Sequence, residues 1–337
     1  MPAVAPFEQF RWSEAAPLLA APNNPAPHGG AAGYMVRPGG VRLRVGVFWP
    51  PAPPRATVLV MTGYSEFLEK YFETIRDLQA QDLAVVLMEW RGHGLSARAL
   101  AHAPARLHLR HLDDNIADLD AVWACIVQHM PQPCFGLAHS MGGQIALRAA
   151  HLWGPRFAAL SLSAPMLGLG VPAWAGRALE GWAKARGALG LDTRPLWGAP
   201  PSRQAGAIAA NTVTTDGARF ARNEALMQMH PSLLVNQVSL GFVRAALRAT
   251  RRSRRVSFLQ AIETPILLGM AEDEQVVSNA SIVQAATGLP RSKLVRYRGA
   301  RHEILMERDE IRQRFLSDAV AWFRAHAAEN PSASRGT

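Results

Sequence analysis

The chain has 337 residues, a formal net charge of +10, and about half of its residues are apolar. This composition excludes a disordered or collagen-like chain, and the length suits one large α/β domain with an insertion. Two cysteines, Cys125 and Cys134, are too few for a disulfide framework, and no Cys/His spacing is typical of a metal site. We therefore expect neither a metal nor a cofactor.

The first residues lack the basic start and apolar core of a secretory signal, and no apolar run reaches the roughly 18 residues of a membrane-spanning helix. We expect a cytoplasmic protein that can contact a membrane peripherally. Residues 244–255, RAALRATRRSRR, carry six arginines. This run is either a solvated segment or one attracted to anionic lipid headgroups. No nucleic-acid-binding module accompanies it, so no nucleic acid partner is expected.

Apolar runs of strand length alternate with apolar residues at helical spacing after residue 40. Residues 1–35 are rich in Pro, Ala and Gly, and we expect an N-terminal extension draped over the surface. The patterns predict strands over 41–49, 56–63, 83–90, 134–140 and 157–165, with helices over 65–81, 114–127 and 141–153. Strands and helices that alternate with short connections indicate a parallel sheet wrapped by helices.

The strand pattern stops after residue 165 and returns with strands over 264–273 and 292–299 and a last amphipathic helix over 309–323. We therefore predict one α/β core, residues 36–165 and 256–327, interrupted by a helical insertion over 166–255. A loose tail is expected over 328–337. Three tryptophans of the insertion lie among small and basic residues: Trp174, Trp182 and Trp197.

Open parallel sheets place their functional sites at the carboxyl ends of the strands. Ser140, Asp273 and His302 each follow a predicted strand. A serine hydroxyl needs a base to become nucleophilic, and the base needs an acid to orient it. We predict Ser140 as the nucleophile, His302 as the base and Asp273 as the acid. Asp273 is preferred to its neighbours Glu272 and Glu274 because of its distance from the strand end.

The sequence AHSMGG, residues 138–143, fits a strained turn between a strand and a helix. In such a turn the residues two before and two after the nucleophile must be small, as Ala138 and Gly142 are. The alternative is an ordinary strand-to-helix turn. We expect His139 to be a structural support, and His93 to belong to the scaffold of another turn.

These segments, in this order, resemble the lysophospholipase and monoacylglycerol lipase group of α/β-hydrolases, which classifications place beside serine aminopeptidases. The bacterial lysophospholipase branch looks most similar, and the resemblance covers roughly residues 33–325. It rests on six segments: TGYSEFLEKY, EWRGHGLS, HLDDNIADL, AHSMGG, AEDEQVV and HEILME. Three positions depart from the family pattern: Thr62 replaces a histidine, Glu89 an aspartate and Ala138 a glycine.

The resemblance implies an α/β-hydrolase fold, a mostly parallel sheet flanked by helices with a helical cap. It also implies an oxyanion hole made by the backbone N–H groups of Tyr64 and Met141. The expected activity is that of a serine hydrolase of lipid metabolism, cleaving a lysophospholipid or monoacylglycerol ester through an acyl-enzyme. A peptidase, a thioesterase, a small-ester esterase and a catalytically silent binding protein are the alternatives. Residues 166–176, MLGLGVPAWAG, form either the mouth for acyl chains or part of the core.

Overall fold

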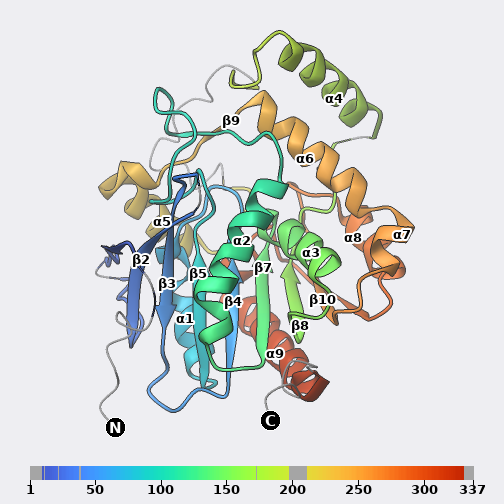
Figure 1. The fold of residues 1–337 in the computed structure, drawn as a ribbon. Coiled ribbons are helices and arrows are strands. Elements are labelled where there is room, and N and C mark those ends of the chain that lie inside the picture. Colours follow the sequence, from blue (N-terminus) through green and yellow to red (C-terminus); the bar gives the residue numbers. More distant parts are fainter. Residues whose placement is uncertain are drawn as a thin grey trace.

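The computed structural model describes residues 10, 12–21, 23–37, 39–171, 173–196 and 211–329 (Figure 1). Its strands are β1 (Glu14–Ala16), β2 (Gly30–Val36), β3 (Arg42–Phe48), β4 (Ala56–Met61), β5 (Leu83–Met88), β6 (Arg106–Leu107), β7 (Cys134–His139), β8 (Ala159–Ser163), β9 (Gln237–Val238), β10 (Ile266–Ala271) and β11 (Ser292–Tyr297). Its α-helices are α1 (Phe72–Gln79), α2 (Asp113–Cys125), α3 (Met141–Trp153), α4 (Ala173–Ala188), α5 (Gly217–Met229), α6 (Leu240–Ser253), α7 (Val256–Gln260), α8 (Asn279–Gly288) and α9 (Asp309–Ala325). Short 3-10 helices are η1 (Leu68–Tyr71), η2 (Val127–His129), η4 (Pro231–Leu233), η5 (Ile304–Met306) and η6 (Ala327–Glu329).

The main sheet runs in the order β1-β2-β3-β5-β4-β7-β8-β10-β11. From β5 to β11 all neighbouring strands are parallel, and β1, β2 and β3 add antiparallel pairs at one edge. The predicted fold class, a mostly parallel sheet flanked by helices, is confirmed. The helix predicted over 65–81 divides into η1 and α1, whereas α3 has the predicted bounds.

Helices cover both faces of the sheet, which explains why its central strands are apolar throughout. In β4, Leu59 and Met61 pack into a core with α2 and α3, the helices turned to the viewer in Figure 1. Val58 and Val60 face the other way and pack with α1 and α9. The carboxyl ends of these buried strands therefore form a rigid edge on which a site can be built. None of the described helices combines the length and the apolarity needed to span a bilayer.

The N-terminal segment is part of the sheet, so the prediction of a draped extension over 1–35 is wrong for β1 and β2. Strand β2 pairs antiparallel with β3 along its whole length, from Gly30 opposite Phe48 to Val36 opposite Arg42. A sheet edge left at β3 would expose unpaired backbone groups, and β2 satisfies them. Its Gly- and Ala-rich sequence carries little strand propensity, so the pairing decides the structure. Residues 1–9 lie outside the described residues.

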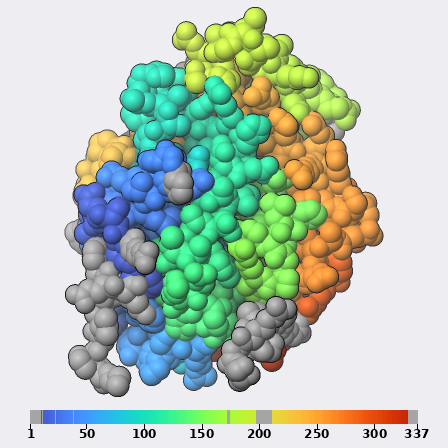
Figure 2. All heavy atoms as spheres, in the orientation of Figure 1, coloured from blue at the N-terminus to red at the C-terminus, as the bar shows by residue number. Residues whose placement is uncertain are grey.

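The insertion between β8 and β10 contains α4, α5, α6, β9 and α7. Strand β9 pairs with β6 of the core, which attaches the insertion to the loop after β5. Helix α4 packs along α6 and forms the top of the molecule in Figures 1 and 2. Trp197 of the insertion and residues 330–337 of the predicted tail lie outside the described residues.

Candidate active site

Ser140 lies on a strained turn between β7 and α3. Its φ is 49° and its ψ is −112°, which is unusual for a residue that is not glycine. The turn is held by its own backbone groups, since the Ser140 N–H donates to the Ser163 carbonyl at 3.0 Å. The Ser140 carbonyl accepts from the N–H groups of Gln144 at 3.1 Å and Met166 at 2.9 Å. The backbone strain predicted for AHSMGG is therefore present.

The two glycines after Ser140 allow α3 to approach the sheet closely. A methyl group on Gly142 would overlap the carbonyl oxygens of Met61 and Thr62 at the end of β4. A methyl group on Gly143 would lie 2.7 Å from the Pro165 Cβ. Small residues two and three positions after the nucleophile are thus a steric requirement of this fold.

His302 links Ser140 to a carboxylate. It follows β11, and its ring is buried with 5% of the residue exposed. Its Nε2 lies 2.9 Å from the Ser140 Oγ, and its Nδ1 lies 2.8 Å from the Glu274 Oε2. The carboxylate holds the proton on Nδ1, so that Nε2 accepts the serine proton. The structure therefore brings Ser140 and His302 together as the sequence predicts.

The acid in contact with His302 is Glu274, so the choice of Asp273 is corrected. Asp273 is exposed, and its N–H donates to the Ala300 carbonyl at 2.9 Å. The Glu274 side chain is only 1% exposed, and its Oε1 accepts from the N–H groups of Val276 at 2.7 Å and Val277 at 3.2 Å. The turn directs residue 274 inward, and the extra methylene of glutamate supplies the reach. Distance from a strand end could not separate three consecutive acids.

The charge of Glu274 is stabilised by its neighbours. Burial acts to raise its pKa, but the hydrogen bond and the electrostatic attraction of His302, together with the N–H groups of Val276 and Val277, outweigh burial and lower the pKa below its ordinary value. The carboxylate is therefore ionised at neutral pH. An ionised acid at this place stabilises the imidazolium that forms when His302 takes a proton.

The loop after β4 carries Tyr64, one of the two predicted oxyanion donors, and it is held by buried charges. Glu66 accepts hydrogen bonds from the Gly63 N–H, from the Tyr71 hydroxyl at 2.6 Å and from the Lys70 Nζ at 2.8 Å. Lys70 also lies 2.7 Å from Glu303, the residue after His302. Burial acts to lower the Lys70 pKa, yet Glu303 and Glu66 raise it. The network connects the loop to the histidine, which explains the motif EFLEKY.

Met141, the other predicted donor, is the first residue of α3, where a backbone N–H has no acceptor within the helix. Thr62 occupies the family's histidine position. Its carbonyl accepts from the Trp90 Nε1 at 2.8 Å, while its Oγ1 has no partner among the described residues. The indole of Trp90, two residues after the end of β5, therefore holds this loop in place.

Glu89, which replaces the family's aspartate, joins three segments. Its carboxylate accepts from the Arg44 guanidinium and the Leu68 N–H, both at 2.9 Å, and from the Leu95 N–H at 2.7 Å. Gly94 has a φ of 49°, and a Cβ there would overlap this carboxylate. Burial raises the pKa of Glu89. The Glu89 side chain thus connects the segment after β4, which contains Leu68, to the loop after β5, which contains Leu95.

A cavity of about 310 Å³ opens onto Ser140 and His302. One face of α5 lines it with Phe220, Asn223, Glu224 and Met227. These residues recur at helical spacing, so a single helix side covers the nucleophile. The described part of the insertion therefore lines the site through α5 and through Thr212 and Val213, which precede it.

None of the described residues of the segment 166–176 lines this cavity. Met166 and Leu167 are buried in the core, and Leu169 and Val171 line a separate cavity of about 340 Å³ beside α6. Of the two interpretations of this segment, core packing describes its first residues, and a mouth at Ser140 is not observed.

His139 and His93 are both buried and lie outside the Ser140–His302–Glu274 chain. The His139 Nδ1 contacts the Ser163 carbonyl at 3.1 Å, and its ring lies 4.8 Å from that of His302. The His93 Nδ1 lies 3.2 Å from the Arg91 carbonyl, and burial lowers its pKa to about 4. These contacts agree with supporting roles. Within the described ranges, no group of His, Cys, Asp or Glu could hold a metal ion.

The fold and the strained serine beside a buried histidine define the α/β-hydrolase class. Residues 52–309 match the serine aminopeptidase S33 family, and the chain belongs to it. It is a hydrolytic enzyme by this membership, as the resemblance implied.

The chain is 31% identical to lysophospholipase L2 of Escherichia coli strain K12 over 294 residues, which cover 83% of each chain. It is 27% identical to phospholipase YtpA of Bacillus subtilis over 264 residues, covering 77% of this chain and 92% of that protein. Two solved structures share the fold at 17% identity. A soluble variant of Saccharomyces cerevisiae monoglyceride lipase has a TM-score of 0.69 and covers 92% of this chain and 100% of its own. A Bacillus coagulans carboxyl esterase has a TM-score of 0.73, and the match covers 88% of this chain and 99% of the esterase chain.

Proposed function

We propose that the protein is a serine hydrolase that cleaves carboxylic esters of lysophospholipids or monoacylglycerols. The observation that carries the proposal is the hydrogen-bonded chain from Ser140 through His302 to Glu274, at the base of a partly apolar cavity. The names of the relatives, a lysophospholipase and a phospholipase, support the same substrate class.

In the proposed mechanism, the Ser140 Oγ attacks the ester carbonyl while its proton passes to the His302 Nε2. Glu274 stabilises the resulting imidazolium through Nδ1. His302 then gives the proton to the oxygen of the leaving alcohol, which leaves an acyl group on Ser140. Water, deprotonated by His302, attacks this acyl-enzyme and releases the fatty acid.

The tetrahedral intermediate carries a negative oxygen that needs fixed donors. The N–H groups of Met141 and Tyr64 are proposed to supply them, since Met141 begins α3 and Tyr64 follows β4 at the same edge of the sheet. A donor of this kind is worth roughly 3–4 kcal/mol in the transition state. The Glu66 and Lys70 network holds the Tyr64 loop in place before substrate binds.

The cavity supports an acyl substrate. Phe67, Phe220, Met227 and Val276 provide apolar surface, and the volume of about 310 Å³ lies at the lower end of small-molecule sites. Polar side chains of the same lining are Lys70, His139, Asn223, Glu224 and Glu303. We propose that an acyl chain lies against Phe220 and Met227 of α5.

The proposal is tested with a panel of substrates and a Ser140→Ala variant. The panel holds p-nitrophenyl esters of short and long chain, monoacylglycerol, lysophosphatidylcholine, an acyl thioester and an aminoacyl amide. We expect long-chain ester hydrolysis, reduced at least about 10³-fold by Ser140→Ala. Ser257→Ala, at an exposed serine of α7, is the matched control and should retain full activity.

The alternatives give different results in the same assay. A preference for the amide or the thioester would indicate a peptidase or a thioesterase. Absence of turnover together with absence of Ser140 labelling by a fluorophosphonate would contradict a hydrolase mechanism and favour a silent binding protein.

We also propose that the protein contacts an anionic membrane peripherally, through α4. Trp174 is 70% exposed and Trp182 is 43% exposed on this helix, and Leu189, just after it, is 75% exposed. Arg177, Lys184 and Arg186 lie on the same helix. Exposed tryptophans next to basic side chains are typical of helices that lie in a membrane interface.

A further inference from the structure

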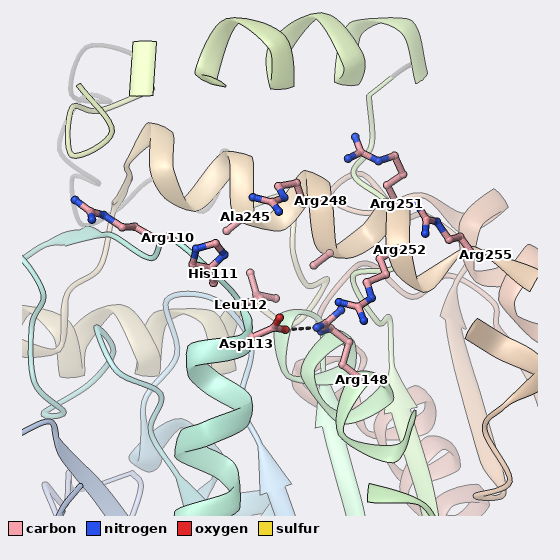
Figure 3. A pocket seen from close by; sticks show the side chains of 11 residues that line it. Arg110, His111, Leu112, Asp113, Arg148, Ala245, Arg248, Arg251, Arg252 and Arg255 are labelled. Atoms are coloured by element: carbon pink, nitrogen blue, oxygen red, sulfur yellow. Dashed lines mark hydrogen bonds and ion pairs between the residues drawn. The ribbon is translucent and has the colours of Figure 1, made fainter. Parts of the chain in front are cut away.

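A third cavity, of about 190 Å³, lies between α6, the start of α2 and the middle of α3 (Figure 3). Arginines dominate its lining, which consists of Arg110, His111, Leu112, Asp113, Arg148, Ala245, Arg248, Ala249, Arg251, Arg252 and Arg255. No residue of this lining also lines the cavity at Ser140. We name it the arginine cavity.

Helix α6 creates the cavity by the spacing of its residues. Arg248 and Arg252 are four residues apart and therefore lie on one side of the helix. Ala245 and Ala249 lie on the same side and leave space because their side chains are short. Part of the arginine run 244–255 therefore lines this cavity.

Only part of the positive charge in the arginine cavity is neutralised. Arg110 pairs with Asp192 at 3.1 Å, Arg148 with Asp113, and Arg251 with Glu180. Within the described ranges, Arg248, Arg252 and Arg255 have no carboxylate partner. The cavity therefore carries an excess of positive charge, and an anion could neutralise it.

The base of the arginine cavity is a buried arginine. Arg148 is 4% exposed, and its Nε–H has no acceptor among the described residues. Arg252 points down toward it in Figure 3. Burial lowers the pKa of Arg148, Asp113 opposes this effect, and the positive charge of Arg252 adds to it. A buried donor without an acceptor is unfavourable, and a bound anion would supply the acceptor.

The start of α2 borders the arginine cavity, because Leu112 and Asp113 both line it. The partial positive charge of the helix N-terminus is offset there by the carboxylates of Asp113 and Asp114 in the first turn. The excess of positive charge therefore comes from the arginines and not from the helix. His111 lies beside it, on the side of Arg248 in Figure 3.

We infer that the arginine cavity binds a phosphate ester group, separately from the ester site at Ser140. Paired guanidinium groups match the oxygens of a phosphate, which accepts several charge-assisted hydrogen bonds. The cavity is smaller than the roughly 300 Å³ of a drug-sized ligand, so it accommodates one headgroup and not a whole lipid. Arg148 follows Ser140 by eight residues, about 12 Å along α3. The inference does not depend on the hydrolase proposal.

The phosphate ester can come from solution or from a lipid headgroup, and two arms distinguish these sources. In the first arm, sn-glycerol 3-phosphate is titrated into the protein by calorimetry. In the second, the protein is sedimented with phosphatidylglycerol vesicles and with phosphatidylcholine vesicles. Arg248→Gln/Arg252→Gln is the test variant. Arg296→Gln/Arg298→Gln, which removes the same charge from exposed positions at β11, is the matched control.

We expect the test variant to bind at least about tenfold more weakly than wild type, and the control to bind within about twofold. If the test variant binds sn-glycerol 3-phosphate more weakly, the ligand is a soluble phosphate ester. If it binds only the vesicles more weakly, the ligand is a lipid headgroup. Equal weakening in both variants would mean that net charge attracts the anion, which overturns the inference. Absence of wild-type binding in both arms also overturns it. The arginines of both pairs are exposed, so we expect both variants to fold. Thermal unfolding of each variant checks this.

Discussion

The carboxylate of Glu274 is the contact that orients His302, and its role can be separated from that of its neighbour. Glu274→Gln keeps the size of the side chain and an acceptor for the backbone of Val276. Its amide would donate toward the His302 Nδ1, which favours the wrong tautomer. We expect kcat for an ester substrate to fall about 10²–10⁴-fold, by analogy with the loss of the acid in other triads.

Asp273→Asn is the matched control for this prediction, because it removes an adjacent carboxylate that is exposed. Its kcat should remain within about twofold of wild type. Steady-state kinetics with a p-nitrophenyl ester measures both variants. A large loss in Asp273→Asn together with a small loss in Glu274→Gln would restore Asp273 as the acid.

At the scale of elements, α5 is held over the active site by an ion pair with α1. Arg219 of α5 donates to both carboxylate oxygens of Glu73, with Nε at 2.9 Å, and Arg222 lies 3.0 Å from it. Burial acts to raise the Glu73 pKa, but the hydrogen bond from Arg219 and the nearby arginines lower it to about 2. The position of the helix that lines the cavity is therefore linked to the charge of one glutamate.

The Glu73 charge makes a pH-dependent contribution to stability. The folded pKa lies below the unfolded value of 4.5, so the contribution is complete above about 4.5 and is lost as pH falls toward 2. We expect Glu73→Gln to lower the free energy of unfolding by about 1–2 kcal/mol at pH 7, after allowance for solvent screening. The difference from wild type should shrink between pH 4.5 and 3 in urea denaturation curves.

Glu310→Gln is the control for this measurement, since Glu310 is an exposed residue in the first turn of α9. It should change stability by less than about 0.5 kcal/mol. A Glu73→Gln difference that grows as pH falls would show that the ion pair does not stabilise the fold.

At the scale of the whole molecule, the proposed membrane contact combines the net charge of +10 with the exposed apolar residues of α4. Helix α4 forms one end of the molecule, as Figure 2 shows. We expect binding to phosphatidylglycerol vesicles that weakens as salt increases, because salt screens the surface charges. Trp174→Ser/Trp182→Ser should reduce this binding at least about tenfold, by loss of inserted apolar area.

Leu152→Ser is the matched control, since Leu152 is 54% exposed on α3, away from α4. Its vesicle binding should equal that of wild type in a sedimentation assay. If the tryptophan variant also binds like wild type, α4 is not the membrane contact.

The sequence alone determined the core of the sheet and two of the residues at its edge. Strands such as β4, β5 and β7 are buried on both faces, and continuous apolar runs of that length are typical of such strands. Ser140 and His302 were located because parallel strands bring their carboxyl ends together, whatever the details of packing. Helix α3 was predicted with its bounds, since the apolar run of the strand stops at Ser140 and apolar residues at helical spacing follow.

Only the tertiary structure decided which acid meets His302, where the sheet begins and what lines the cavity. Glu274 is selected by a turn whose backbone N–H groups hold its carboxylate, and Asp273 differs from it in sequence by one position. Strand β2 forms because β3 offers an edge, and α5 reaches Ser140 through ion pairs with α1. The arginine cavity joins residues from three helices and loops far apart in the chain. Such features depend on contacts between distant segments, and local sequence patterns carry no record of those contacts.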